Sequence, residues 1–95
     1  MSDPLSDDEI KDALAGLEGW ERKDNALVKN FEFKNFSQAI AFIVRIGFVC
    51  EKADHHPELT NVYNRVTLAF TTHDAGSRIT ERDVDVARKV EKLKR

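Results

Sequence analysis

The sequence of 95 residues has few of the features that impose a special architecture. It contains one cysteine, Cys50, which cannot form an intrachain disulfide, so a disulfide-stapled secreted domain is excluded and a small buried hydrophobe is expected instead. No segment reaches the roughly 18 consecutive apolar residues of a membrane span, and residues 1–8 lack the basic and apolar regions of a signal peptide. These absences predict a cytoplasmic protein that does not cross a membrane.

Neither sign of charge is in large excess. Lys and Arg number 15 and Asp and Glu 17, which gives a net charge of −2 with neutral histidines. Domains that bind nucleic acid are usually strongly basic, so no direct nucleic-acid partner is expected. The hydrophobic content of 41% suits a globular core, and the length suits one such core. We therefore expect a single domain over residues 1–95.

The first part of the chain has the pattern of a helix followed by a β-hairpin. Ser6 and Glu9 form a capping-box pair in front of apolar residues at helical spacing, which predicts a helix over 7–17. The segments 20–23 and 27–33 then flank a turn-forming Asp-Asn pair, and the second of them contains alternating apolar residues. This arrangement predicts the first hairpin.

The second part of the chain repeats this order. An asparagine cap followed by a wide apolar stripe predicts a long helix over 36–53. Strands are then predicted over 60–63 and 66–72, on either side of a two-residue turn at 64–65. This arrangement predicts the second hairpin.

A capping box formed by Thr80 and Asp83 opens a third helix, which ends in a run of basic residues at 88–95. The order of elements is therefore α-β-β-α-β-β-α. It predicts an α+β fold in which a four-stranded antiparallel sheet has helices packed on one face.

All three histidines of the chain, His55, His56 and His73, bracket the second predicted hairpin. With the turn at 64–65, His56 lies opposite His73, so that two imidazoles face each other. Pro57 cannot donate a hydrogen bond to a sheet, so the strand should begin after it. The nearby carboxylates that could orient the imidazoles and fix their tautomers belong to Glu51, Asp54, Glu58 and Asp74. We expect a polar pocket suited to proton transfer.

Other interpretations of the histidines remain open at this point. A His-His-Pro segment can cap a strand without any chemistry. Three imidazoles could also hold a zinc ion with water as the fourth ligand, although adjacent histidines fit one ion poorly and no HExxH or CxxC motif accompanies them. Nucleophilic catalysis is disfavoured because Cys50 falls on the apolar side of its helix and no serine has a nucleophile-elbow setting. Metal binding and nucleophilic catalysis are therefore the less favoured interpretations.

The histidines belong to a longer pattern. Glu-Lys-Ala-Asp-His-His-Pro-Glu at 51–58 is followed by Asn-Val-Tyr-Asn-Arg-Val at 61–66, Thr-Thr-His-Asp at 71–74 and Thr-Glu-Arg-Asp at 80–83. Together these segments resemble the pterin-4a-carbinolamine dehydratase family over nearly the whole chain. One departure concerns the rim of the pocket, since Leu59 stands where some members carry an aromatic residue.

The resemblance implies an enzyme that dehydrates 4a-hydroxytetrahydropterin to quinonoid dihydropterin, a step in the recycling of tetrahydrobiopterin. It implies no metal or organic cofactor, and a homodimer or homotetramer. We expect His55 and His73 to exchange protons with the substrate while His56 holds the pterin. The positions that match the family's substrate-binding residues are His55, His56, Pro57, Thr72, His73, Asp74 and Ala75.

Two rival functions are compatible with the same residues. The apolar stripe of the helix over 36–53 is wider than one small sheet needs, which would suit a module for protein assembly in which catalysis is secondary. A pterin-binding protein without turnover would retain the pocket and show no effect on rate. The intact trio of histidines favours the enzyme.

Overall fold

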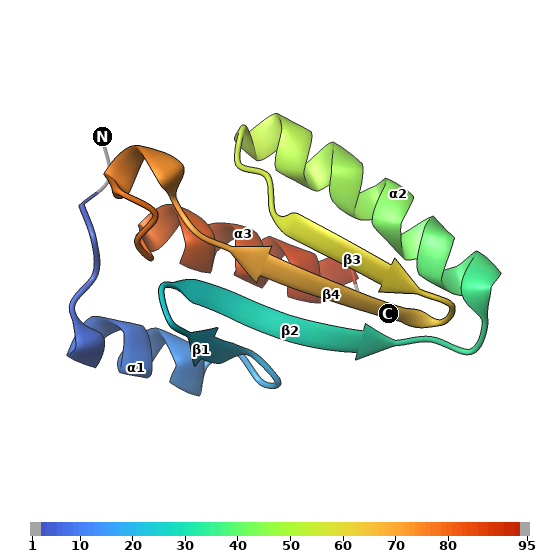
Figure 1. The fold of residues 1–95 in the computed structure, drawn as a ribbon, viewed down its shortest axis with the longest axis horizontal. Helices are drawn as coiled ribbons and strands as arrows, with labels where there is room; N and C mark the ends of the chain where they lie inside the picture. The colour runs from blue at the N-terminus through green and yellow to red at the C-terminus, as the bar shows by residue number, and fades with distance from the viewer. Residues whose placement is uncertain (1–2, 94–95) are drawn as a thin grey trace.

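The computed structural model describes residues 3–93, and its elements follow the order α-β-β-α-β-β-α (Figure 1). The helices are α1 (Asp7–Ala15), α2 (Phe36–Ala53) and α3 (Glu81–Leu93), the strands are β1 (Glu21–Lys23), β2 (Ala26–Glu32), β3 (Glu58–Val62) and β4 (Arg65–Phe70), and a 3₁₀ turn, η1, spans His73–Ala75. The strands form one antiparallel sheet in the order β1-β2-β4-β3. The α+β prediction is confirmed. The two basic residues at 94–95, predicted to extend the third helix, lie outside the described residues.

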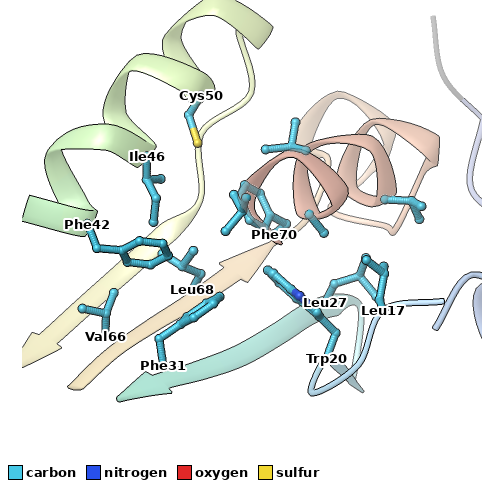
Figure 2. Packing of buried hydrophobic residues seen from close by; sticks show 14 of the residues in the cluster. Leu17, Trp20, Leu27, Phe31, Phe42, Ile46, Cys50, Val66, Leu68 and Phe70 are labelled. Atoms are coloured by element: carbon cyan, nitrogen blue, oxygen red, sulfur yellow. The ribbon is translucent and has the colours of Figure 1, made fainter. Parts of the chain in front are cut away.

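The core lies between the helices and one face of the sheet. Figure 2 shows Phe42, Ile46 and Cys50 of α2 directed toward the sheet, where Val66 and Leu68 of β4 meet them. All of these side chains are almost fully buried, and each large one contributes about 1.5–3 kcal/mol to stability when it leaves water. Within residues 3–93, no helix has both the length and the apolar character needed to cross a bilayer.

The bounds of α2 match the prediction because both of its ends are capped locally. Asn35 accepts a hydrogen bond from the backbone N–H of Gln38 (2.9 Å), and Asp54 ends the helix in a left-handed conformation with φ 52°. Burial raises the pKa of the Cys50 thiol to about 11, so the thiol stays protonated at neutral pH and lacks the reactivity of a thiolate. The first helix ends at Ala15, two residues before the predicted end, with Gly16 as its C-cap.

The predicted register of the second hairpin is wrong. Val62 pairs with Arg65, so the turn consists of Tyr63 and Asn64 rather than residues 64–65. Two hydrogen bonds to a distant residue hold Asn64 in the turn, and the local sequence does not reveal them. The Asn64 side chain donates to the carbonyl of Phe33 (2.8 Å), and the Asn64 carbonyl accepts from the Phe33 N–H (2.8 Å). The strands consequently span Glu58–Val62 and Arg65–Phe70 instead of the predicted ranges.

This change moves the partner of each strand residue by two positions, so the side chains that remain in β3 and β4 keep their predicted faces. The predicted facing pair of His56 and His73 is lost, however. The observed register extrapolates to Thr71 opposite His56, and His73 has left the sheet to begin η1. The structure therefore brings the two imidazoles to one site by a different route.

The turn of the second hairpin gives the first test. Tyr63 adopts φ 51°, a conformation that costs a residue with a Cβ roughly 1–2 kcal/mol, and its side chain is mostly exposed. Tyr63→Gly is expected to have a free energy of unfolding about 1 kcal/mol higher than Tyr63→Ala, measured by urea denaturation. If the alanine variant is the more stable of the two, the turn assignment is incorrect.

Candidate active site

The residues of the predicted site gather at one end of the sheet. Figure 1 shows the loop from α2 to β3 and the η1 turn after β4 at the same end, close to the start of α3. They enclose an open pocket of about 480 Å³. Its lining residues are Asp54, His55, His56, Pro57, Glu58, Thr71, Thr72, His73, Asp74 and Arg82. All three histidines therefore face one cavity, whereas Ala75 and Glu51 do not line it.

His55 is the buried member of the trio, with 7% of its surface exposed. Its ring stacks on Phe70 at a centroid distance of 6.0 Å, and its Nε2 lies 2.5 Å from Oδ1 of Asp83. Because an ionised carboxylate can only accept, Nε2 carries the proton of this hydrogen bond. The other ring nitrogen, Nδ1, has no hydrogen-bond partner among residues 3–93, and His55 lines the pocket.

Asp83 holds His55 in this orientation and is itself fully buried. Its second oxygen, Oδ2, accepts hydrogen bonds from the Thr72 hydroxyl and from the backbone N–H of Thr80, both at 2.8 Å. The Thr72 and Thr80 hydroxyls are 2.7 Å apart. The carboxylate thus ties α3 to Thr72, in the segment after β4, and to the loop after α2. The predicted capping role of Asp83 is confirmed, but its contact with a histidine was missed.

His56, although adjacent in sequence, is in a different environment. Its side chain is 57% exposed, and its Nε2 lies 2.9 Å from Oε1 of Glu51. Of the nearby carboxylates named from the sequence, Glu51 is thus within hydrogen-bonding distance of an imidazole. Because both groups are in water, this pair contributes little to folding stability and mainly directs the ring.

His73 begins η1, lines the same pocket and is exposed. Its Nδ1 lies 3.4 Å from the Ser77 hydroxyl, which is a weak contact. The expectation that Asp54, Glu58 or Asp74 orients a histidine is not met, because no hydrogen bond of the described residues joins their carboxylates to an imidazole.

Arg82 is a lining residue that sequence reasoning did not identify. One guanidinium nitrogen donates to the backbone carbonyl of Asp54 (2.8 Å), and another lies 3.9 Å from the carboxylate of Asp74. The side chain therefore bridges the loop after α2 and the η1 turn. The only local signal was its position next to Asp83 in the Thr-Glu-Arg-Asp segment, at the start of a helix that faces the histidines.

The arrangement provides groups for moving protons. Asp83 fixes the His55 ring through Nε2, which leaves Nδ1 for a ligand, and the carboxylate can stabilise the imidazolium form of the ring. His56 and His73 lie in contact with solvent and can exchange protons with it. Within the described part of the chain, no group of three His, Cys, Asp or Glu side chains is arranged to hold a metal ion.

The buried carboxylate leads to a stability prediction. Asp83→Asn replaces an acceptor oxygen by an NH₂ donor and breaks at least one of the three hydrogen bonds, so we expect the free energy of unfolding to fall by about 2–4 kcal/mol. Asp85→Asn is the matched control, since Asp85 is exposed on the same helix and should change stability by less than about 0.5 kcal/mol. Equal urea midpoints for the two variants would contradict the role assigned to Asp83.

Comparison with known proteins gives the same family as the sequence pattern. Residues 3–93 match the family model described as Pterin 4 alpha carbinolamine dehydratase. A protein of Thermomicrobium roseum, named as a candidate pterin-4-alpha-carbinolamine dehydratase, is 49% identical over 94% of this chain and 95% of its own length. A crystal structure from Brucella melitensis, titled a transcriptional coactivator/pterin dehydratase, superposes with a TM-score of 0.91 at 39% identity and covers 96% of this chain and 98% of its own. The chain belongs to the pterin-4-alpha-carbinolamine dehydratase family.

Proposed function

We propose that this protein dehydrates a 4a-hydroxytetrahydropterin to quinonoid dihydropterin in the cytoplasm, by histidine acid–base catalysis and without a cofactor. The observation that carries the proposal is the convergence of His55, His56 and His73 on one open pocket in a chain of the dehydratase family. In a cell that hydroxylates aromatic amino acids, this reaction returns the pterin to the recycling of tetrahydrobiopterin.

The reaction needs two proton transfers and no redox step. The lone pair of the ring nitrogen next to the hydroxyl-bearing carbon forms a C=N bond as the C–O bond breaks. The departing oxygen takes up a proton and leaves as water, and the nitrogen loses a proton. A positioned acid or base gives a rate effect of typically about 10²–10⁴-fold, which suits a reaction that also proceeds without an enzyme.

The environments of the histidines support different roles. His55 suits the base, because it lines the pocket and its Nε2 is bonded to Asp83, which keeps the ring in place and leaves Nδ1 for the substrate. His73 suits the acid, because it lines the same pocket and its exposed ring can be reprotonated from solvent. His56, directed by Glu51, suits the role of holding the pterin.

Further substrate contacts are proposed at the positions that match the family's pattern. Pro57, Thr72 and Asp74 line the pocket, so a bound pterin could touch each of them. Ala75 does not line the pocket, and its N–H donates to the carbonyl of Thr72 (3.1 Å), so its part is to shape the turn that carries His73.

We also propose that the protein works as a homodimer or homotetramer. The outward side of α2 exposes Phe36, Ile40, Val44 and Phe48 at intervals of four residues, which makes one continuous apolar stripe. Monomers rarely leave such a surface in water, so a second copy of the helix is a suitable cover. The same stripe favours the alternative function of an assembly module, in which a partner protein would bind α2 and the histidines would be dispensable.

The catalytic proposal is tested by following freshly made 4a-hydroxytetrahydropterin by absorbance. His55→Ala and His73→Ala should lower kcat by about 10–100-fold, because each removes one proton-transfer group, whereas His56→Ala should mainly raise KM. The control is Glu32→Gln, a change at the opposite end of the sheet that should leave both constants unchanged. Unchanged turnover in the His73 variant would remove that residue from the mechanism, and an inactive wild-type protein would refute the dehydratase.

The oligomer is tested by sedimentation of the wild type and of Phe48→Asp. The exposed fraction of Phe48 is 74% in the single chain, so the substitution should leave the fold intact and place a charge in the proposed interface. The wild type should sediment as a dimer or tetramer and the variant as a smaller species. A monomeric wild type at micromolar concentration contradicts the interface.

A further inference from the structure

We infer that the pocket selects against pterins with an anionic side chain and accepts those whose side chain is uncharged. The inference rests on the proposed function for the identity of the bound ring. It assigns the discrimination to three carboxylates at the mouth of the pocket, those of Asp54, Glu58 and Asp74, and it names the class of pterin that the site can use.

The carboxylates lie where a substituent on the ring would emerge. Asp54, Glu58 and Asp74 all line the pocket and are all exposed to solvent, and the side chain of Asp74 is 84% exposed. The buried wall is formed by His55 and Thr72 instead. A ring that reaches the His55 imidazole therefore directs any flexible substituent outward, past these carboxylates.

The positive charge at the mouth belongs to Arg82, which already contacts other groups of the protein. Arg82 is the one Arg or Lys among the described lining residues. Its guanidinium donates to the Asp54 carbonyl (2.8 Å) and faces the Asp74 carboxylate at 3.9 Å. An anionic substituent that approaches Arg82 also approaches the Asp74 carboxylate, whose repulsion offsets the attraction of the guanidinium.

Protonation of the histidines does not reverse the sign of the pocket. A proton added to His55 or His56 is balanced by the carboxylate that each already contacts, Asp83 and Glu51 respectively. A protonated His73 then adds one positive charge to that of Arg82, against the three carboxylates of the mouth. The net charge around the substrate is negative in every protonation state of the imidazoles.

The expected size of the effect follows from Coulomb's law. Two like charges about 7 Å apart in water repel by enough to weaken binding roughly two- to threefold, and salt near 1 M screens the repulsion. The three carboxylates of the mouth exceed Arg82 by two charges, or by one when His73 is protonated, so the discrimination should be about three- to tenfold at low salt. It should nearly vanish at high salt.

Two fluorescent pterins that differ by one carboxylate test the inference without relying on turnover. The dissociation constants of unsubstituted pterin and 6-carboxypterin are measured by fluorescence at about pH 7, in about 10 mM and about 1 M NaCl. We expect 6-carboxypterin to bind about three- to tenfold more weakly at low salt and nearly equally at high salt. Equal affinities at low salt, or tighter binding of 6-carboxypterin, overturn the inference.

Variants that each remove one carboxylate show which residues cause the difference in affinity between the two pterins. Asp74→Asn removes one like charge and frees Arg82, so it should reduce the ratio of the two dissociation constants at low salt by about threefold, and Glu58→Gln should reduce it by less. Glu32→Gln is the matched control, because it changes the net charge equally at the far end of β2 and should leave the ratio unchanged. If Glu32→Gln reduces the ratio as much as Asp74→Asn, the mouth does not set the selectivity.

The same protein sample, assayed for dehydratase turnover, separates this inference from the proposed function. Turnover combined with equal dissociation constants contradicts the charge selection alone. Charge-dependent binding without turnover contradicts the dehydratase alone. Failure of both pterins to bind, together with absence of turnover, contradicts both.

Discussion

The buried hydrogen bond between His55 and Asp83 is the interaction on which the rest of the site depends. It joins the loop after α2 to the start of α3, and the other oxygen of Asp83 adds Thr72, which follows β4. A carboxylate without exposure is costly to bury unless its oxygens are satisfied, and here an imidazole N–H, a hydroxyl and a backbone N–H satisfy them. The network that fixes the imidazole is therefore also a condition for folding. A substitution at His55 or Asp83 therefore changes both the stability of the fold and the geometry of the pocket.

The two adjacent histidines show how the end of a helix can assign different environments to neighbours. Asp54 ends α2 in a left-handed conformation and turns the chain back toward the core. His55 consequently enters the buried network, while His56 stays in water beside Glu51 of the helix that has just ended. This difference in burial supports the proposed division between a proton-transfer group and a group that holds the substrate.

Features with a local cause could be predicted from the sequence, and features with a distant cause could not. The bounds of α2 follow from Asn35 and from the apolar spacing behind it, which is why 36–53 was predicted correctly. The turn of the second hairpin depends on Asn64 bonding to Phe33, a residue 31 positions away, so the local pattern gave the wrong register. The capping pattern around Asp83 identified a helix start, whereas its bond to a histidine 28 positions away needed the fold.

The central claim is that His55 is held with its proton on Nε2 and with Nδ1 free to accept a proton from a ligand. Nitrogen-15 NMR of the histidine side chains measures this directly at about pH 7.5. The account predicts that His55 has a protonated Nε2 whose hydrogen exchanges slowly with water, and an Nδ1 signal of an unprotonated nitrogen that shifts when a pterin is added. A His55 protonated on Nδ1, or an Nε2 hydrogen that exchanges as fast as that of His56, would contradict it.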